Sequence, residues 1–244
     1  MWPIFIKEIK TVFDDVIGFV AIGLFLIINT LFLWVISSSF NIIQSGFADL
    51  TLFFELAPWL LLIVIPALSM RSFSEEIKTG TIELLLSKPV SIGSIVWGKF
   101  FAIFFVGFLA VLPTLSYIYF VHLLLPDETT LDKGMLLGGY IGLLLFLAML
   151  AALGVFVSSV SRQQTTAFLV SLFLGFGHFY LWGQLANSLP SFFWYKWVSN
   201  MGMQAHYTSI NRGILSTGDL SYFIGGTVFL LVLTQYRIQK LQAQ

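Results

Sequence analysis

Charged residues are so sparse in this chain that the gaps between them are long enough to cross a lipid bilayer. They make up 10% of the 244 residues, whereas hydrophobic residues make up 58%. A soluble domain of this size could not bury so much apolar surface, because a folded chain of this length still exposes a large part of its area. The sequence therefore predicts a polytopic membrane protein.

Six apolar stretches lie between the charged residues, and each approaches the roughly 20 residues that a membrane-spanning helix needs. We place the spans at residues 16–36, 50–71, 95–120, 135–157, 165–185 and 221–236. No stretch alternates apolar and polar residues in the manner of a strand. We therefore expect an all-α membrane protein with six transmembrane helices, in a single transmembrane domain over residues 1–244.

The distribution of Lys and Arg predicts how these spans are oriented. The segments on one side hold nine such residues and those on the other side hold Lys133, Lys196 and Arg212. Positive residues concentrate on the cytoplasmic side of membrane proteins. Both termini are therefore expected in the cytoplasm, and the N-terminus shows no small-residue cleavage site for a removable signal peptide.

Residues 1–15 predict an interfacial helix rather than a span. Apolar residues at positions 2, 5, 6, 9, 12 and 13 form one helical face, and Lys7, Glu8 and Lys10 lie on the other. A helix of this kind lies along the membrane surface. It could serve as a simple anchor or also contact a cytoplasmic partner.

The loop at residues 71–99 predicts two short helices with a break between them. Ser72 and Glu75 have the spacing of a capping box, Gly80 can end the first helix, and Thr81 can begin the second. Pro89 prevents further helix. The resulting apolar patch rimmed by charge suits docking to another protein, although the same loop could instead rest on lipid headgroups.

The segment at residues 186–219 is too aromatic for a free aqueous loop. It contains the run Phe192-Phe193-Trp194-Tyr195-Lys196-Trp197. Because Trp and Tyr favour the membrane–water interface, we expect a re-entrant or interfacial segment on the outer side.

Motifs for chemistry by this chain alone are absent or incomplete. Residues 93–99 match G-x-x-x-x-G-K, but Phe100 stands where a nucleotide site needs the Ser or Thr that binds Mg²⁺. No cysteine, zinc-protease motif or nucleophile elbow occurs. We expect no catalytic residue, metal site or bound cofactor, and the zero net charge gives no footprint for nucleic acid.

A face of small residues follows the fourth span. It begins with Gly138 and Gly142 in G-x-x-x-G spacing and continues to Gly154. Such a face allows close helix packing. The packing could lie within one chain or between two chains.

Two groups of residues resemble the ABC-2 type transporter permeases. The first is Arg71-x-Phe73-x-x-Glu76, Gly80-Thr81-Ile82-Glu83-Leu84-Leu85, Ser87-x-Pro89 and Gly98-Lys99-Phe100. The second, in the outer segment, is His206-Tyr207, Asn211-Arg212-Gly213 and Asp219-Leu220-x-Tyr222-Phe223. Within the family, residues 40–59 look most like the gliding-motility-associated subunits of the GldF-like subfamily.

The resemblance implies the membrane subunit of an ATP-driven exporter in the bacterial inner membrane. Residues 74–88 would be the coupling helix between spans 2 and 3, pressed into a groove of a cytoplasmic ABC ATPase. Its contacts would come from Glu75, Glu76, Gly80, Thr81, Ile82, Glu83, Leu84, Leu85 and Pro89.

ATP and Mg²⁺ would belong to that ATPase. A second permease subunit would complete a homo- or heterodimer, with a GldG-like protein as one candidate. His206, Arg212, Gly213 and Asp219 would form the outer-segment motif. The alternative is a non-transporting membrane scaffold for a motility or cell-envelope machine, and the bilayer lipid is a partner in either case.

Overall fold

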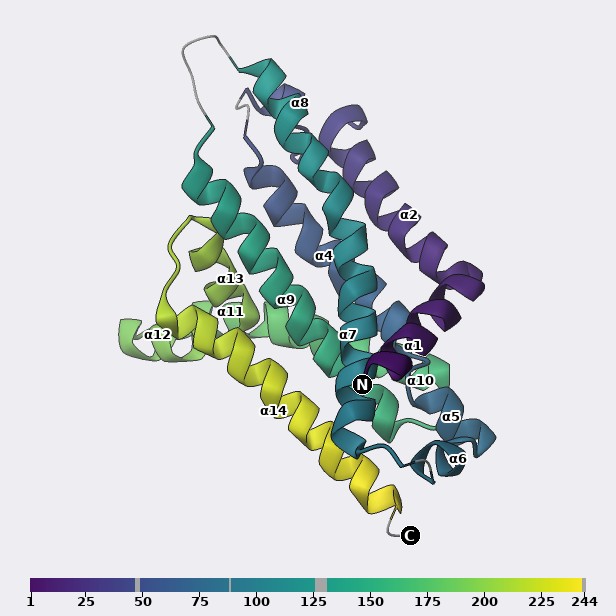
Figure 1. Cartoon of the computed structure of the whole chain (residues 1–244). Helices are drawn as coiled ribbons and strands as arrows, with labels where there is room; N and C mark the ends of the chain where they lie inside the picture. Colours follow the sequence, from purple (N-terminus) through teal and green to yellow (C-terminus); the bar gives the residue numbers. More distant parts are fainter. Residues whose placement is uncertain (47–48, 88, 126–130, 243–244) are drawn as a thin grey trace.

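The computed structural model describes residues 1–46, 49–87, 89–125 and 131–242, and within these ranges every regular element is a helix (Figure 1). Residue 88, the last of the expected coupling helix, and residues 47 and 48 of the GldF-like stretch lie outside these ranges. In chain order the elements are α1 (Trp2–Asp14), α2 (Val16–Thr30), η1 (Leu31–Val35), α3 (Ile42–Ser45), α4 (Thr51–Ser69), α5 (Ser74–Thr79), α6 (Ile82–Leu86), α7 (Ile92–Val111), η2 (Leu112–Leu115), α8 (Ser116–Leu124), α9 (Lys133–Val160), α10 (Gln164–Phe176), η3 (Gly177–Leu181), α11 (Trp182–Asn187), α12 (Phe192–Ser199), α13 (Met203–Asn211) and α14 (Thr217–Gln242).

Six helical segments of the described residues are long and apolar enough to cross a membrane. They are Val16–Val35, Thr51–Thr79, Ile92–Leu124, Lys133–Val160, Gln164–Asn187 and Thr217–Gln242. The predicted all-α class with six spans is confirmed. The last helix runs beyond the predicted range to include Asp219, Arg237 and Lys240, because a helix can continue into the polar headgroup region where charge is tolerated.

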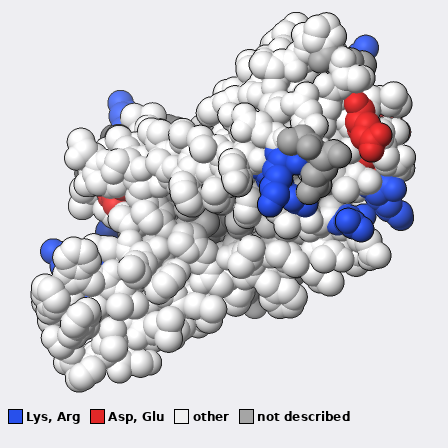
Figure 2. Space-filling view, turned by 90° about the horizontal axis from the view of Figure 1, so that it is seen from below, with Lys and Arg blue, Asp and Glu red and all other residues white. Residues whose placement is uncertain are grey.

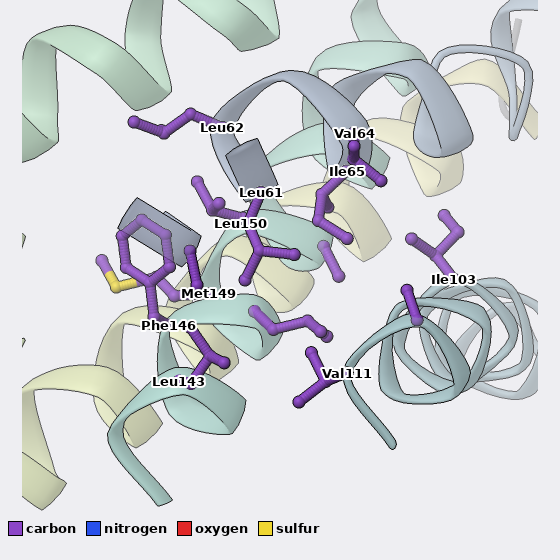
Figure 3. Close-up of a cluster of buried hydrophobic side chains, with 14 of the residues drawn as sticks. Leu61, Leu62, Val64, Ile65, Ile103, Val111, Leu143, Phe146, Met149 and Leu150 are labelled. Atoms are coloured by element: carbon purple, nitrogen blue, oxygen red, sulfur yellow. The ribbon is translucent and has the colours of Figure 1, made fainter. Parts of the chain in front are cut away.

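The core of the bundle lies between α4, α7 and α9 (Figure 3). Leucine, isoleucine and valine side chains of α4 face Phe146 and Leu150 of α9, with Ile103 and Val111 of α7 closing the cluster. These residues are almost fully buried. The helices α2, α10 and α14 lie outside this core, so that most of their apolar side chains face outward, as lipid contact requires.

The small-residue face of α9 packs within this chain. A side chain at Gly138 would approach the backbone oxygen of Ile210 in α13 to 2.4 Å, and one at Gly154 would collide with Ser69 of α4. Gly142 faces Ile210 as well. The face that could have joined two chains therefore joins α9 to α13 and α4.

The bundle has two distinct ends, which we name after the short helices that they carry. Both termini lie at the α5–α6 end (Figure 1). There Gln242 Nε2 donates to the Leu86 carbonyl at 3.4 Å, and Ile4 of α1 lies against Gly98 of α7. The α12–α13 end carries the aromatic segment and the start of α9, where the Asp132 carboxylate accepts from the amides of Gly134 and Met135.

Candidate functional site

The expected coupling segment forms two short helices that meet at a glycine. α5 ends at Thr79, and Gly80 follows with a φ of 73°. This left-handed conformation favours glycine because it has no Cβ. The hydroxyl of Thr81 lies 2.9 Å from that of Thr79 across the break. α6 then ends at Leu86, shortly before Pro89.

The start of α5 is held by a serine from the far end of α9. Ser158 Oγ accepts hydrogen bonds from the amides of Phe73 and Ser74, each at 3.0 Å, and donates to the Met70 carbonyl at 3.0 Å. The first two of these hydrogen bonds are buried and the third is partly buried. A single hydroxyl thus pairs both amides at the start of α5 and a carbonyl in the turn that follows α4.

The capping-box prediction for Ser72 and Glu75 is wrong. The N-cap of α5 is Phe73, which provides no side-chain acceptor. The Ser72 carbonyl instead accepts a hydrogen bond from Lys99 Nζ at 2.5 Å. The Ser158 hydroxyl, distant in sequence, caps α5 in place of the Ser72 hydroxyl.

Replacing Ser158 with alanine should lower the stability of the α4–α5 junction. Two buried amides would lose their acceptor, which costs about 1–3 kcal/mol. We expect a lower Tm and faster proteolysis within residues 70–89. The matched control is Ser159→Ala, since Ser159 is equally buried but bonds only to the Phe156 carbonyl of its own helix. Equal effects of the two substitutions would contradict the bridging role.

A neutral group of four charged residues ties α5 to α1 and α7. Lys99 Nζ lies 2.9 Å from Glu8 Oε1 and 3.0 Å from Glu76 Oε2, and Lys7 Nζ lies 3.1 Å from Glu76 Oε1. Lys99 also stands over the Phe73 ring, 4.9 Å from its centroid. Its side chain is only 1% exposed. We call Lys7, Glu8, Glu76 and Lys99 the charge quartet.

The charges in the quartet depend on one another. Burial alone would lower the pKa of Lys7, but the neighbouring carboxylates of Glu76 and Glu8 outweigh it and raise that pKa above 10.5. Lys7 is therefore a cation at physiological pH. Buried charges are tolerated when each has a partner of opposite sign and hydrogen bonds complete the shell.

A second ion pair lies beside the quartet. Arg71, in the turn after α4, pairs with Asp15 at the junction of α1 and α2. Its Nε also donates to Gln164 Oε1 at the start of α10, at 3.1 Å. The quartet and Arg71 line a common cleft of about 250 Å³. Every helix that reaches this end is thus joined to α5 or to the turn that precedes it, apart from α14, which contacts α6.

The expected coupling residues divide into an exposed group and a held group. Glu75, Gly80, Thr81, Glu83 and Pro89 are exposed, and Leu84 is 67% exposed. Ile82 is buried, Leu85 is half-buried against the core, and Glu76 belongs to the quartet. Seen from this end, acidic and basic atoms gather on the side of the molecule that carries α5 and α6 (Figure 2).

The outer-segment motif forms a hydrogen-bonded group at the opposite end. His206 Nδ1 lies 2.6 Å from Asp219 Oδ1, and its Nε2 lies 2.8 Å from the Asn200 carbonyl. Because that carbonyl can only accept, Nε2 donates to it. The His206 ring stacks on Tyr222 with centroids 4.0 Å apart. The Tyr222 hydroxyl in turn lies 2.8 Å from His178 Nε2.

The family model described as ABC-2 family transporter protein matches residues 2–236. The chain belongs to this family. A search of the curated proteins found no match. Both the α5–α6 surface and the outer motif lie inside the matched range, and the six spans agree with a membrane permease of an ABC transporter.

Tyr207 anchors the outer motif of this ABC-2 permease in the bundle. Its hydroxyl donates to the Phe54 carbonyl of α4 at 2.6 Å. Burial, followed by the charge of Glu55, raises the pKa of Tyr207 well above its ordinary value, so the hydroxyl stays protonated. After the end of α13, Gly213 has a φ of 80°, which favours glycine. A Cβ at this position would also lie 3.0 Å from the backbone carbonyl carbon of Gly134. Arg212 beside it is exposed.

Sequence reasoning missed the residues that hold the permease's α5 in place. In the sequence Lys99 is the last residue of an incomplete nucleotide motif and part of the family resemblance, yet in the structure it is the most buried cation of the described residues. Its place in the Gly98-Lys99-Phe100 resemblance was the one available signal. Nothing in the sequence near Ser158 marks it as the partner of α5.

Proposed function

We propose that this permease is the membrane subunit of an ATP-driven exporter, with the exposed face of α5 and α6 docked on a separate cytoplasmic ATPase. The observation that carries the proposal is the contrast within these two helices. Glu75, Glu83 and Leu84 point outward, while Glu76 and Ile82 are held inside the chain. A surface built in this way can bind a partner without losing its own packing.

The chemistry of the exposed face defines the surface expected on the ATPase. Leu84 requires an apolar pocket, and the carboxylates of Glu75 and Glu83 require basic residues around it. Glu76 does not contribute to this contact in our proposal, because both of its oxygens already face lysines of this chain.

The held residues would carry motion from the ATPase to the spans. A displacement of α5 would act on α7 through Lys99, on α1 through Glu8 and Lys7, and on α9 through Ser158. Charged and hydrogen-bonded contacts of this kind keep helices in a fixed relation while they move as rigid bodies. ATP hydrolysis in the partner would then drive rearrangement of the bundle.

ATP and Mg²⁺ are assigned to the partner subunit and not to this chain. Residues 93–99 lie in the first turns of α7 and not in a loop after a strand. Lys99, which would have to reach a phosphate, is buried between two carboxylates.

Replacing Leu84 with aspartate tests the docking proposal. We expect the ATPase affinity in mild detergent to fall at least tenfold, because a central apolar contact would become a buried charge. Pull-down from native membranes with an ATP hydrolysis assay gives the measurement. The control is Leu215→Asp, an exposed leucine at the opposite end. Unchanged ATPase recovery with Leu84→Asp would contradict the proposal.

A second permease subunit, identical or GldG-like, is proposed to complete the transporter in the bacterial inner membrane with both termini in the cytoplasm. The Lys and Arg distribution supports this orientation, since Lys7, Arg71 and Lys99 lie at the α5–α6 end. The resemblance of residues 40–59 supports a link to gliding motility. Purification of the native complex identifies the partner subunit.

The alternative function is a non-transporting scaffold, and the apolar core favours it. The described side chains between α4, α7 and α9 leave no polar path for a cargo. An exporter with this core must move its cargo between two permease subunits. Stimulation of ATP hydrolysis by a cargo would exclude the scaffold.

A further inference from the structure

A polar groove runs beside the outer motif at the α12–α13 end. It has a volume of about 400 Å³, and its walls come from α11, α12 and α13. Its lining residues include Gly183, Asn187, Ser199, Gln204, Thr208 and Arg212. Amide and hydroxyl side chains thus line much of the groove, and the contacts of α5 at the other end do not use it.

One face of α13 forms the floor of this groove. Gln204, Thr208 and Arg212 follow one another at intervals of four residues, which places them in line along the helix. Eight residues of helix rise by about 12 Å. The groove is therefore elongated, with Gly202 at one end and Arg212 at the other.

The electrostatics of the groove favour an anion. None of its lining residues is acidic, and Arg212 is their one full charge. Within the described residues the structure gives the Arg212 guanidinium no hydrogen bond or ion pair, and the residue is exposed. At the other end, Gly202 is the N-cap of α13 and provides no side-chain cap, and the first turn of α13 has no acidic residue. Free first-turn amides and a free guanidinium both suit phosphate oxygens.

The neighbouring helix α12 sets the depth of the groove in the bilayer. None of its residues is buried, and Phe192, at 80%, is the most exposed of its aromatic side chains. Trp194 and Trp197 are exposed beside it. Tryptophans of this kind lie at the level of the lipid headgroups. The groove behind them therefore opens where lipid phosphates are found, with apolar surface alongside for acyl chains.

We propose that this groove binds the phosphate-bearing headgroup of an anionic lipid. The Arg212 guanidinium pairs with the phosphate, and the amide and hydroxyl side chains of Asn187, Gln204 and Thr208 bond to the polar remainder of the headgroup. The acyl chains lie along the aromatic surface of α12. The proposal is independent of ATPase docking, so its test uses the full-length permease alone.

Native mass spectrometry of the purified full-length chain measures lipid retention directly. Phosphatidylglycerol is compared with an uncharged galactosyl diacylglycerol that carries the same acyl chains. We expect preferential retention of phosphatidylglycerol, and about a tenfold loss of its affinity in Arg212→Gln. Gly183→Leu should weaken binding without a change of charge, because its Cβ enters the groove 3.2 Å from the flexible end of Gln204.

The control is Lys133→Gln, which removes a cation from the same end but outside the groove. Equal retention of the two lipids by the unaltered chain, or equal losses in Arg212→Gln and Lys133→Gln, would overturn the proposal. Competition with glycerol phosphate separates the sources of the phosphate. Displacement of the lipid assigns recognition to the headgroup alone, and retention of the lipid assigns it to headgroup and acyl chains together.

Discussion

Replacement of Lys99 by methionine should be among the most damaging single changes in this permease. It would leave Glu8 and Glu76 facing each other at a largely buried site without the cation that lies between them. Removing one partner of a buried ion pair costs about 3–5 kcal/mol. We expect a marked loss of Tm in detergent and, in the assembled transporter, ATP hydrolysis that no longer responds to the permease.

Two variants separate this effect from a general loss of positive charge. Lys78→Met removes an exposed cation of α5 and should leave the Tm nearly unchanged. The double variant Lys99→Met with Glu76→Gln should recover part of the lost stability. It removes the second negative charge beside Glu8, which keeps Lys7 as an ion-pair partner 3.7 Å away. Equal Tm values for Lys99→Met and Lys78→Met would show that the quartet does not stabilise the fold.

Substitution of Gly138 by alanine should disrupt the other end of the bundle. The added Cβ would lie 2.4 Å from the Ile210 carbonyl oxygen and 2.9 Å from Gly213 Cα, both of which are backbone atoms. Neither can move without displacing α13. We expect a loss of about 3 kcal/mol, at the upper end of the cost of overpacking, and release of the outer motif from α9, seen as faster cleavage within residues 200–216.

A glycine with free space around it provides the comparison. A Cβ at Gly225, in the span α14, would meet no atom within 4 Å. Gly225→Ala should therefore be neutral or slightly stabilising, since alanine favours helix more than glycine does. Similar losses in the two variants would indicate that helix propensity, and not the contact with α13, explains the result.

The six spans could be predicted because charge marks their ends. Asp15 and Arg162 stand close to helix boundaries, and the apolar stretches between the charges leave little choice of structure in a bilayer. The break at Gly80 followed from equally local chemistry, since a left-handed residue is needed there. Local signals of this kind survive in the fold because nothing distant competes with them.

The internal contacts of α5 could not be predicted because their partners are far apart in the sequence. Ser158 is separated from Phe73 by 85 residues, and Lys7 from Glu76 by 69. A charged residue near a span also looks the same in sequence whether it faces water, lipid headgroups or another charge. In the sequence Glu76 therefore could not be distinguished from Glu75 and Glu83, although only Glu75 and Glu83 are exposed.

The outer motif shows the same limit at the other end. His206 and Asp219 were singled out together, and the structure joins them in one hydrogen bond. Their link through Tyr222 to His178 in the fifth span depended on how three helices meet. The residue types could be recognised in the sequence, whereas the contacts that connect them depend on how the helices pack and could not be predicted.

The bridge made by Ser158 also has a consequence for biosynthesis. The ribosome completes α5 well before it reaches this serine, so the first amides of α5 wait for their acceptor until the fourth span has been inserted. The nascent permease therefore cannot complete the start of α5 before α9 is made. A chain stalled after three spans would present α5 without this anchor, and docking of the proposed ATPase on α5 would then depend on insertion of the fourth span.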